Sequence, residues 1–286
     1  MQAGLDDSNN LRPSVLITGC NGYVGRNLIK ALEGRVDFIG VDCVPGGHES
    51  ELIDLRDGTS YTQLDRYTFD YVLHCAWDQI SQNIYENNMQ CARNLFNYLK
   101  QKTPQGFIFI SSSFASTTTG IQYTRSKIAF ENMLFESSIP FVIIRPDMLY
   151  SADEKKMQEQ RSYMEKGFAI CIGNGQSLRS PTHINDLVEL VHSVITTKQF
   201  TNKVYEIGSP IPYSQEQVLK IVAASIGRNP FIVKIPTLVA QLLFQVTKKV
   251  DPEQARTIGY DRVADLRALR EDFGLHPRDF NTGVTQ

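Results

Sequence analysis

The sequence predicts an α/β fold: a doubly wound parallel sheet of the Rossmann type with a smaller C-terminal substrate lobe. Three observations predict it. Short apolar runs alternate with amphipathic helical patterns up to Pro146, as in parallel sheets covered on both faces. A glycine-rich turn follows the first run, and the alternation loosens after Pro146. The expected divisions are a polar tail over 1–12, the main nucleotide-binding domain over 13–150, and mainly the substrate lobe over 151–286.

Each element of the main domain has its own signal. Strands are predicted where β-branched and aromatic residues form short runs, and helices where apolar residues recur every three or four positions. The predicted strands, in order, are 14–18, 36–42, 51–55, 70–76, 106–112 and 140–146. The predicted helices between them are 23–34, 85–101 and 123–137. Right-handed crossovers between parallel strands then produce the doubly wound sheet.

The substrate lobe has weaker signals. A strand near 203–207 is expected to return to the main sheet, and the stretch 169–181 is expected to be irregular. In the apolar stretch 238–246, Leu238, Leu242 and Phe244 can share one helical face. We expect that face to pack in the core of the lobe, with a partner or membrane surface as the alternative. The predicted helices of the lobe are 152–167, 184–197 and 214–227.

The composition is that of an ordinary globular protein. The 286 residues are 42% hydrophobic and 21% charged, with a net charge of −2, which gives no electrostatic case for nucleic acid or an anionic membrane. The N-terminus has no signal-peptide or transit-peptide pattern, and no stretch is apolar enough to span a membrane. Five scattered cysteines indicate reduced thiols in a cytoplasmic protein. No Cys/His spacing suggests a zinc site, so we expect no metal.

Three glycines at a three-residue spacing, Gly19, Gly22 and Gly25, lie between the first strand and the first helix. The first glycine permits a tight turn, the second lets the backbone approach a pyrophosphate, and the third lets the helix pack closely on the strand. The helix N-terminus offers free N–H groups and a partial positive charge to phosphates. This loop therefore predicts a dinucleotide site rather than a merely tight turn.

An acidic residue, Asp42, ends the second predicted strand about 20 residues beyond the glycine loop. There a carboxylate accepts hydrogen bonds from the adenosine ribose and repels a 2′-phosphate. Asp42 thus favours NAD over NADP, although a solvated strand-end Asp is the alternative interpretation. Arg26 and Arg35 are near enough in sequence to leave NADP open.

Tyr123 and Lys127 are four positions apart on a predicted helix, hence one turn apart on the same face. That helix starts at the carboxyl edge of the sheet, where ligands of open α/β folds bind. Bringing the phenol pKa from about 10 to about 7 takes roughly 4 kcal/mol of differential stabilisation. A nearby ammonium and a positive nicotinamide ring can supply such a shift. The pair predicts proton transfer at a substrate oxygen.

With these motifs the sequence resembles the extended short-chain dehydrogenase/reductases, also called the NAD-dependent epimerase/dehydratase family, over about residues 13–280. Asn88 and Glu131 match positions where the family has a structural Asn and a typical Glu. The motifs that carry the resemblance are "TGCNGYVG", "IDLRD", "HCAW", "YTRSKIAFE", "IIRP" and "GNGQSLRSPTHINDL".

The resemblance implies roles for individual residues. Tyr123 is the implied acid/base, Lys127 binds the nicotinamide ribose and lowers the tyrosine pKa, and Ser113 is the catalytic hydroxyl. The implied cofactor-binding residues are Gly19, Asn21, Gly22, Tyr23, Val24, Gly25, Asp42, Asp54, Leu55, Cys75, Ala76, Trp77, Tyr123 and Lys127. The implied substrate-binding residues are Trp77, Ser113 and Arg179.

Arg179 matches an arginine that grips the diphosphate of the substrate in the family, whereas His183 and Asp186 match positions that are usually structural. Trp77 follows the fourth predicted strand, where it lines the substrate pocket or serves as a buried structural Trp.

Two departures from the family pattern stand out. Ser113 and Tyr123 are only ten positions apart, less than is usual in the family, which leaves Ser112 and Ser116 as alternatives to Ser113. The dehydratases of the family carry Asp-Glu after the catalytic hydroxyl, but here Phe114 and Ala115 stand there. Without those carboxylates an elimination reaction is disfavoured.

The sequence therefore predicts a cytoplasmic NAD-dependent epimerase or oxidoreductase that acts on a nucleotide sugar. Its alternatives are a net NAD(P)H-dependent reductase of a 4-keto nucleotide sugar or other small ketone, and a non-catalytic dinucleotide-binding subunit. The resemblance also implies a homodimer.

Overall fold

The main domain is built on a seven-stranded sheet in which every neighbouring pair of strands is parallel. The computed structural model describes residues 12–116, 120–247 and 257–285, and the predicted tail falls almost wholly outside them. The strand order is β11-β6-β5-β4-β1-β2-β3. The strands are β1 Ser14–Thr18, β2 Asp37–Asp42, β3 Glu51–Leu52, β4 Tyr71–His74, β5 Gly106–Ile110, β6 Phe141–Pro146 and β11 Lys203–Ile207.

This order confirms the predicted fold class. The direction of winding reverses between β1 and β4, where an open α/β sheet forms its ligand crevice. β11 joins the sheet beside β6, with Lys203 opposite Val142. In the sequence, β11 follows the first part of the substrate lobe, so the lobe is interleaved with the end of the sheet.

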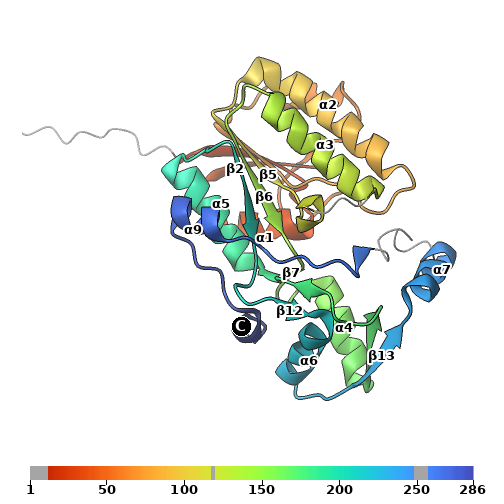
Figure 1. Cartoon of the computed structure of the whole chain (residues 1–286). Coiled ribbons are helices and arrows are strands. Elements are labelled where there is room, and N and C mark those ends of the chain that lie inside the picture. The colour runs from red at the N-terminus through yellow and green to blue at the C-terminus, as the bar shows by residue number, and fades with distance from the viewer. Residues whose placement is uncertain (1–11, 117–119, 248–256, 286) are drawn as a thin grey trace, which may run out of the picture.

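Helices cover both faces of the sheet (Figure 1). One face packs against α1 Tyr23–Leu32, α5 Ile184–Thr197 and α9 Arg267–Phe273, whose apolar residues share one core with the sheet. The other face packs against α2 Ile84–Lys102 and α3 Gln122–Glu136, around a second core rich in phenylalanine. Since each fully buried Leu, Ile or Phe contributes about 1.5–3 kcal/mol, these two cores hold the strand ends in fixed positions.

The substrate lobe lies beside the carboxyl edge of the sheet (Figure 1). Its core lies among α4 Lys155–Glu165, α6 Gln215–Ser225 and β8 Phe168–Ile172, which pairs with β13 Phe231–Ile235. The other short elements are η1 Ser60–Leu64, η2 Ser113–Ser116, β7 Leu149–Tyr150, β9 Leu178–Arg179, β10 Thr182–His183, β12 Tyr213–Ser214 and α10 Phe280–Gly283.

The prediction that 169–181 is irregular is wrong, because that stretch contains most of β8 and all of β9. β8 is a short strand followed by Gly173 and Gly175, both at positive φ. A five-residue strand next to such a turn carries little periodic signal. Its pairing with β13, which begins about 60 residues later, supplies the order that the local sequence does not.

The expectation that 238–246 packs in the core of the lobe is also wrong for the side chains that the structure describes. In α7 Thr237–Thr247, Leu238, Val239, Leu242 and Leu243 are 71, 45, 58 and 49% exposed, and Ala240 is buried. Figure 1 shows α7 extending from the lobe. The side chain of Phe244 lies outside the described residues. Over the described part of the chain, no helix is long and apolar enough to cross a membrane.

Candidate active site

A pocket of about 1200 Å³ runs along the carboxyl edge of the sheet and into the substrate lobe. The glycine loop, the ends of β2 and β4, and the start of α3 line its sheet side. Residues of α4, β8 and α6 line its lobe side, where Met157, Ile170 and Val222 make the wall apolar. The pocket therefore reaches both the predicted cofactor site and the predicted substrate site.

The glycine loop has the shape that a diphosphate requires. Gly19 has φ +71°, and a Cβ there would lie 2.5 Å from the Ala76 nitrogen. A Cβ on Gly25 would overlap the Gly19 carbonyl oxygen. Gly22 is the N-cap of α1 and lines the pocket. The loop thus presents the N-terminus of α1 to the pocket, and these residues fit the pyrophosphate of NAD.

Asp42 lies at the end of β2, where its carboxylate accepts hydrogen bonds from the Asn21 nitrogen at 2.9 Å and the Val44 nitrogen at 3.2 Å. The Asn21 side chain donates to the Val44 carbonyl oxygen at 2.8 Å, so it fastens the loop to the strand. A carboxylate has about four acceptor sites, and two remain for ribose hydroxyls. The ribose-binding role of Asp42 stays a prediction.

The variant Asp42→Ser is expected to bind NADH about 10–100-fold more weakly, because it loses charge-assisted hydrogen bonds to the ribose. Its affinity for NADPH is expected to fall less, since the repulsion of a 2′-phosphate is also removed. Titration of each cofactor against both proteins checks this. Equal losses for the two cofactors would show that Asp42 only supports the loop.

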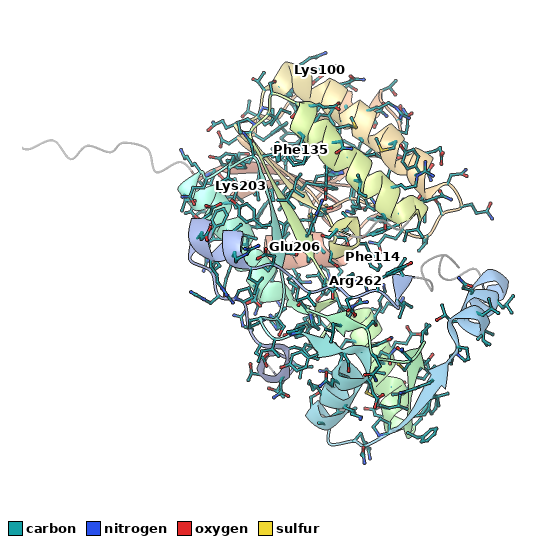
Figure 2. All side chains as sticks on the ribbon, viewed as in Figure 1. Lys100, Phe114, Phe135, Lys203, Glu206 and Arg262 are labelled. Carbon is teal, nitrogen blue, oxygen red and sulfur yellow. The ribbon has the colours of Figure 1, made fainter. Side chains whose placement is uncertain are left out.

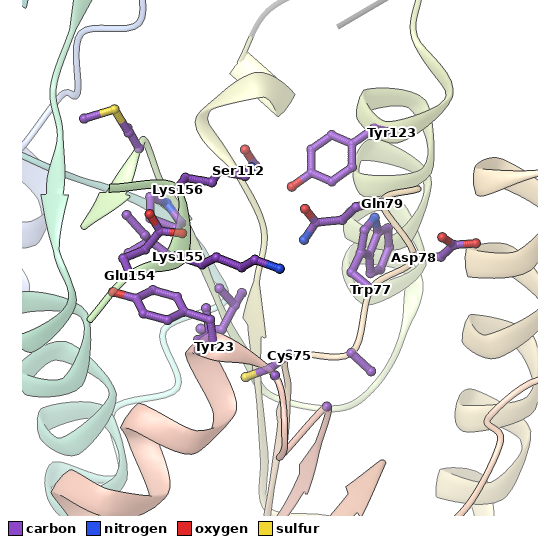
Figure 3. A pocket seen from close by; sticks show the side chains of 18 of the residues that line it. Tyr23, Cys75, Trp77, Asp78, Gln79, Ser112, Tyr123, Glu154, Lys155 and Lys156 are labelled. Atoms are coloured by element: carbon purple, nitrogen blue, oxygen red, sulfur yellow. The ribbon is translucent and has the colours of Figure 1, made fainter. Parts of the chain in front are cut away.

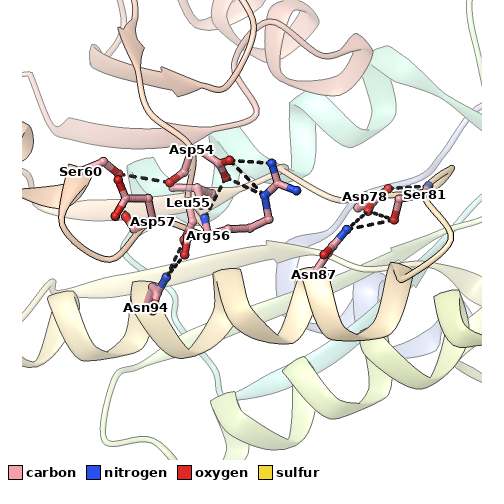
Figure 4. Close-up of polar contacts among 9 residues, drawn as sticks. All are labelled: Asp54, Leu55, Arg56, Asp57, Ser60, Asp78, Ser81, Asn87 and Asn94. Carbon is pink, nitrogen blue, oxygen red and sulfur yellow. Dashed lines mark hydrogen bonds and ion pairs between the residues drawn. The ribbon is translucent and has the colours of Figure 1, made fainter.

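Asp54 and Leu55, which the family resemblance implies as cofactor-binding residues, line the same pocket beyond Asp42. Figure 4 shows Asp54 paired with Arg56, whose Nη2 lies 2.6 Å from the Asp54 carboxylate. The Asn94 side chain donates to the carbonyl oxygens of Leu55 and Arg56 at 3.0 and 2.8 Å. Helix α2 thereby fixes the backbone at Leu55 and Arg56.

Two asparagines of α2 hold the loop after β4 in place. Asn87 Nδ2 donates to Asp78 at 2.9 Å (Figure 4). Asn88 forms two hydrogen bonds with the backbone of Asp78. Its Oδ1 accepts from the Asp78 nitrogen at 2.8 Å, and its Nδ2 donates to the Asp78 carbonyl oxygen at 3.0 Å. Cys75, Ala76 and Trp77, the predicted cofactor contacts, line the pocket immediately before this loop.

Lys127 is 3% exposed and lies below Tyr123 on α3. Its ammonium donates to the Ile110 carbonyl oxygen at 2.7 Å and stands 3.9 Å from the centre of the Trp77 ring. Burial lowers the pKa of Lys127 to about 7, against an opposing effect of Cys75 and Glu131. Trp77 is thus both a pocket wall and a support for Lys127, through a cation–π contact.

This buried ammonium makes stability depend on pH. Because the folded pKa of Lys127 is about 7 and the unfolded pKa about 10.4, the unfolded chain binds more protons between those values. The contribution of Lys127 to the free energy of unfolding should therefore rise with pH between these two pKa values, by about 1 kcal/mol per pH unit. Urea unfolding at pH 7.5–9 should show this extra slope in the native protein relative to Lys127→Met. Identical slopes would contradict it.

Tyr123 also lines the pocket. Burial raises the pKa of its phenol, and a hydrogen bond from Ser112 opposes that rise. Figure 3 shows the Ser112 and Tyr123 side chains beside each other at the pocket. The Lys127 ammonium lies 5.9 Å from the centre of the Tyr123 ring. In the protein alone Ser112, rather than Lys127, is the group that lowers the phenol pKa.

The structure does not bring Ser113 to Tyr123. Ser113 begins η2, and its hydroxyl donates to Asp147 at 2.9 Å in a neighbouring cavity of about 220 Å³. Ser116 lines the same cavity and donates to Glu206 at 2.6 Å. Ser112 and Ser113 therefore lie in different cavities, although they are adjacent in sequence. Ser112, left open as an alternative, lines the main pocket together with Tyr123, as Ser81 and Ser111 also do.

Arg179 lines the main pocket as predicted, but its Nε is paired with Asp147 Oδ2 at 3.1 Å. Asp147 also faces Arg262, whose Nε lies 3.2 Å from Oδ1, and the Arg262 guanidinium stacks 3.8 Å from the centre of the Phe114 ring (Figure 2). One buried carboxylate is thus shared by two arginines. Sequence reasoning missed Asp147 and Arg262, although Asp147 directly follows strand β6 at the ligand edge.

His183 and Asp186 lie at the start of α5 and do not line the main pocket. His183 Nδ1 accepts from the Asn185 nitrogen at 3.1 Å and caps the helix. Asp186 pairs with Arg278, which ties the C-terminal segment to α5. All five cysteines lie in the described ranges and are free. Within those ranges, no group of three or more His, Cys, Asp or Glu side chains could hold a metal ion.

Comparisons with known proteins agree with this geometry. The model of the NAD dependent epimerase/dehydratase family matches residues 15–208. A UDP-glucose 4-epimerase of Vibrio cholerae is 26% identical over 92% of this chain and 90% of its own length. The crystal structure of the Thermus thermophilus UDP-glucose 4-epimerase in complex with NAD has a TM-score of 0.75 at 17% identity, covering 95% of this chain and 96% of that one.

A more distant relative is a mitochondrial protein of Arabidopsis thaliana, subunit 9 of the NADH dehydrogenase 1 alpha subcomplex. It is 22% identical over 60% of this chain and 47% of its own length. The family description names NAD, in agreement with the predicted cofactor.

Proposed function

Because this chain belongs to the NAD-dependent epimerase/dehydratase family, we propose that it is an epimerase of a UDP-linked sugar that uses Ser112, Tyr123 and Lys127. NAD supplies the chemistry of the reaction by accepting a hydride from a sugar carbon and returning it. The observation that carries the proposal is the convergence of these three side chains with the glycine loop in one pocket.

Each residue has a definite task. The Tyr123 phenol exchanges a proton with the sugar hydroxyl whose carbon is oxidised and reduced. The Ser112 hydroxyl holds that oxygen and, through its bond to Tyr123, aligns the phenol. The Lys127 ammonium, fixed by Ile110 and Trp77, would bind the ribose of the nicotinamide and would add positive charge behind Tyr123.

A similar protein and one pocket residue support the substrate class. The Vibrio cholerae relative is named for UDP-glucose, and Arg179 lines the pocket with a guanidinium that suits a diphosphate. Phe114 and Ala115 stand where carboxylates would be needed for elimination, so epimerisation is favoured over dehydration. A homodimer in the cytoplasm is part of the proposal.

The protein as purified provides the first test. An epimerase regenerates its cofactor at every turnover, so the cofactor does not need to leave the protein between turnovers. Denaturation of the purified protein should therefore release NAD or NADH, to be identified by mass. Recovery of NADPH alone would contradict the argument from Asp42 and favour a net reductase.

A second candidate is a non-catalytic dinucleotide-binding subunit. Two observations favour it: the similarity to a protein named as a subunit of an NADH dehydrogenase subcomplex, and the exposed aliphatic side chains of α7. Retention of full cellular function by a Tyr123→Phe variant that still binds NAD would support this candidate.

A further inference from the structure

The cavity of about 220 Å³ that Ser113 lines is a second candidate site. Its walls come from η2, from the ends of β6 and β11, and from residues 261–264. Asp147 lines both this cavity and the main pocket, whereas Arg262 lines only the second cavity. The residues of the proposed reaction all line the main pocket, so the second cavity has no part in that reaction.

The guanidinium of Arg262 is the unusual group in this cavity. Arg262 is 4% exposed, and within the described residues none of its three side-chain nitrogens has a hydrogen-bond partner. Its Nε lies 3.2 Å from Asp147 Oδ1, which is an ion pair without hydrogen-bond geometry. A buried donor that lacks a partner destabilises the fold, and native structures contain few such groups. An arginine kept in this state therefore points to a ligand that accepts from it.

The charges around Arg262 leave one positive charge unbalanced. The Asp147 carboxylate accepts from the Ser113 hydroxyl, the Arg179 Nε and the Ser180 nitrogen at 2.9, 3.1 and 3.2 Å. Three of its roughly four acceptor sites are thus used before Arg262 is counted. One buried carboxylate faces two guanidinium groups, so it cannot satisfy the N–H groups of Arg262.

The other charged residues that line this cavity already have partners. Arg145 pairs with Glu131, and its Nη1 donates to Ser116 at 3.2 Å. Glu206 accepts from the Ser116 hydroxyl at 2.6 Å, and Asp261 accepts from a backbone nitrogen at 2.8 Å. Because Glu206 is half-buried and Asp261 is exposed, solvent screens these two carboxylates more than it screens the buried guanidinium.

We propose that this cavity binds a small monocarboxylate, whose two oxygens accept from Nη1 and Nη2 of Arg262. A guanidinium matches a carboxylate as a bidentate fork. One unbalanced positive charge suits one negative charge, and Glu206 and Asp261 would repel a dianion more strongly. The cavity volume is several times the roughly 30 Å³ of a water molecule, so a ligand with a few carbon atoms fits. This site goes beyond the proposed function and does not depend on it.

The proposed site lies one aromatic ring away from the main pocket. Phe114 lines the main pocket, and its ring centre lies 3.8 Å from the Arg262 guanidinium (Figure 2). The same ring meets Tyr123 edge-on at 6.0 Å. Because Arg262 does not line the main pocket, the carboxylate and a ligand of the main pocket can bind at the same time.

Acetate is the probe, titrated into the purified protein by calorimetry at constant ionic strength, with chloride as the replaced anion and sulfate as the dianion. The variants are Arg262→Gln, Glu206→Gln and the control Arg161→Gln. Arg161 also has a buried Nε without a hydrogen-bond partner, but it lines neither cavity. Glu206→Gln keeps Arg262 in place, so it tests the site independently of whether Arg262→Gln folds.

The native protein should bind acetate with a Kd of about 1–10 mM, because one bidentate charge pair carries the binding, and should bind sulfate more weakly. Arg262→Gln should weaken acetate binding about tenfold or more. Glu206→Gln should tighten acetate binding about 2–5-fold, since a neighbouring negative charge is removed. Arg161→Gln should keep the native affinity, and acetate should still bind when NADH and UDP saturate the main pocket.

No acetate binding to the native protein up to about 100 mM would overturn the proposal and leave the proposed function standing. Native affinity in Arg262→Gln, or unchanged or weaker binding in Glu206→Gln, would overturn it as well. So would loss of acetate binding in the presence of NADH and UDP, because the anion would then lie in the main pocket.

Discussion

Tyr123→Phe is expected to lower kcat/KM by about 10²–10⁴, because general acid/base catalysis contributes that much and no other phenol on α3 can replace it. The substitution removes one oxygen and keeps the ring, whose edge-on contact with Phe114 at 6.0 Å should persist. NADH affinity and the free energy of unfolding should change little. Steady-state kinetics together with Trp77 fluorescence would separate catalysis from binding.

A suitable control is Tyr163→Phe, since Tyr163 packs on Phe168 in the lobe and does not line the pocket. That variant should keep native kinetics. If Tyr123→Phe lost less than about threefold in kcat/KM, Tyr123 would not be the group that moves the proton. The non-catalytic candidate would then gain support.

Ser112→Ala and Ser113→Ala are expected to have opposite effects. Removal of a hydroxyl that holds a reacting oxygen costs about 10²–10³ in kcat, and we expect that loss for Ser112→Ala. Ser113→Ala should keep kcat within a few fold but lower the free energy of unfolding by about 1–2 kcal/mol, since Asp147 loses a buried hydrogen bond. Each variant removes one hydroxyl oxygen, and the two positions are adjacent in the sequence. Each variant therefore serves as the control for the other.

The kinetics of these two variants show whether the family resemblance or the structure identifies the catalytic serine. Family resemblance selects Ser113, whereas the position of Ser112 in the same pocket as Tyr123 selects Ser112. A large loss of kcat in Ser113→Ala with native activity in Ser112→Ala would mean that η2 rearranges when substrate binds. Urea unfolding measures the accompanying change in stability.

The fold class and most strands of the main sheet could be predicted because their signals are local and repeated. β1, β2, β4, β5 and β6 each lie in a short apolar run, and the glycine loop has a spacing that a tight phosphate-binding turn requires. Tyr123 and Lys127 are related by a single helical turn, so their common face follows from the sequence alone.

The remaining features depend on contacts between distant segments. Ser112 and Ser113 are chemically identical in sequence, and only the backbone turn into η2 sends one to Tyr123 and the other to Asp147. Arg262 reaches Asp147 from 115 positions away, without any motif. The pairing of β8 with β13 and the exposure of α7 likewise depend on how the lobe assembles.

Redox-neutral catalysis on a nucleotide sugar is tested most directly by the stoichiometry of the cofactor. The purified protein, loaded with NAD, would be incubated with UDP-glucose while sugar products are separated by chromatography and NADH is followed by absorbance. Our account predicts that UDP-galactose forms over many turnovers with no net NADH produced or consumed. One NADH produced or consumed per product molecule, or no epimer from UDP-linked sugars at any cofactor level, would contradict it.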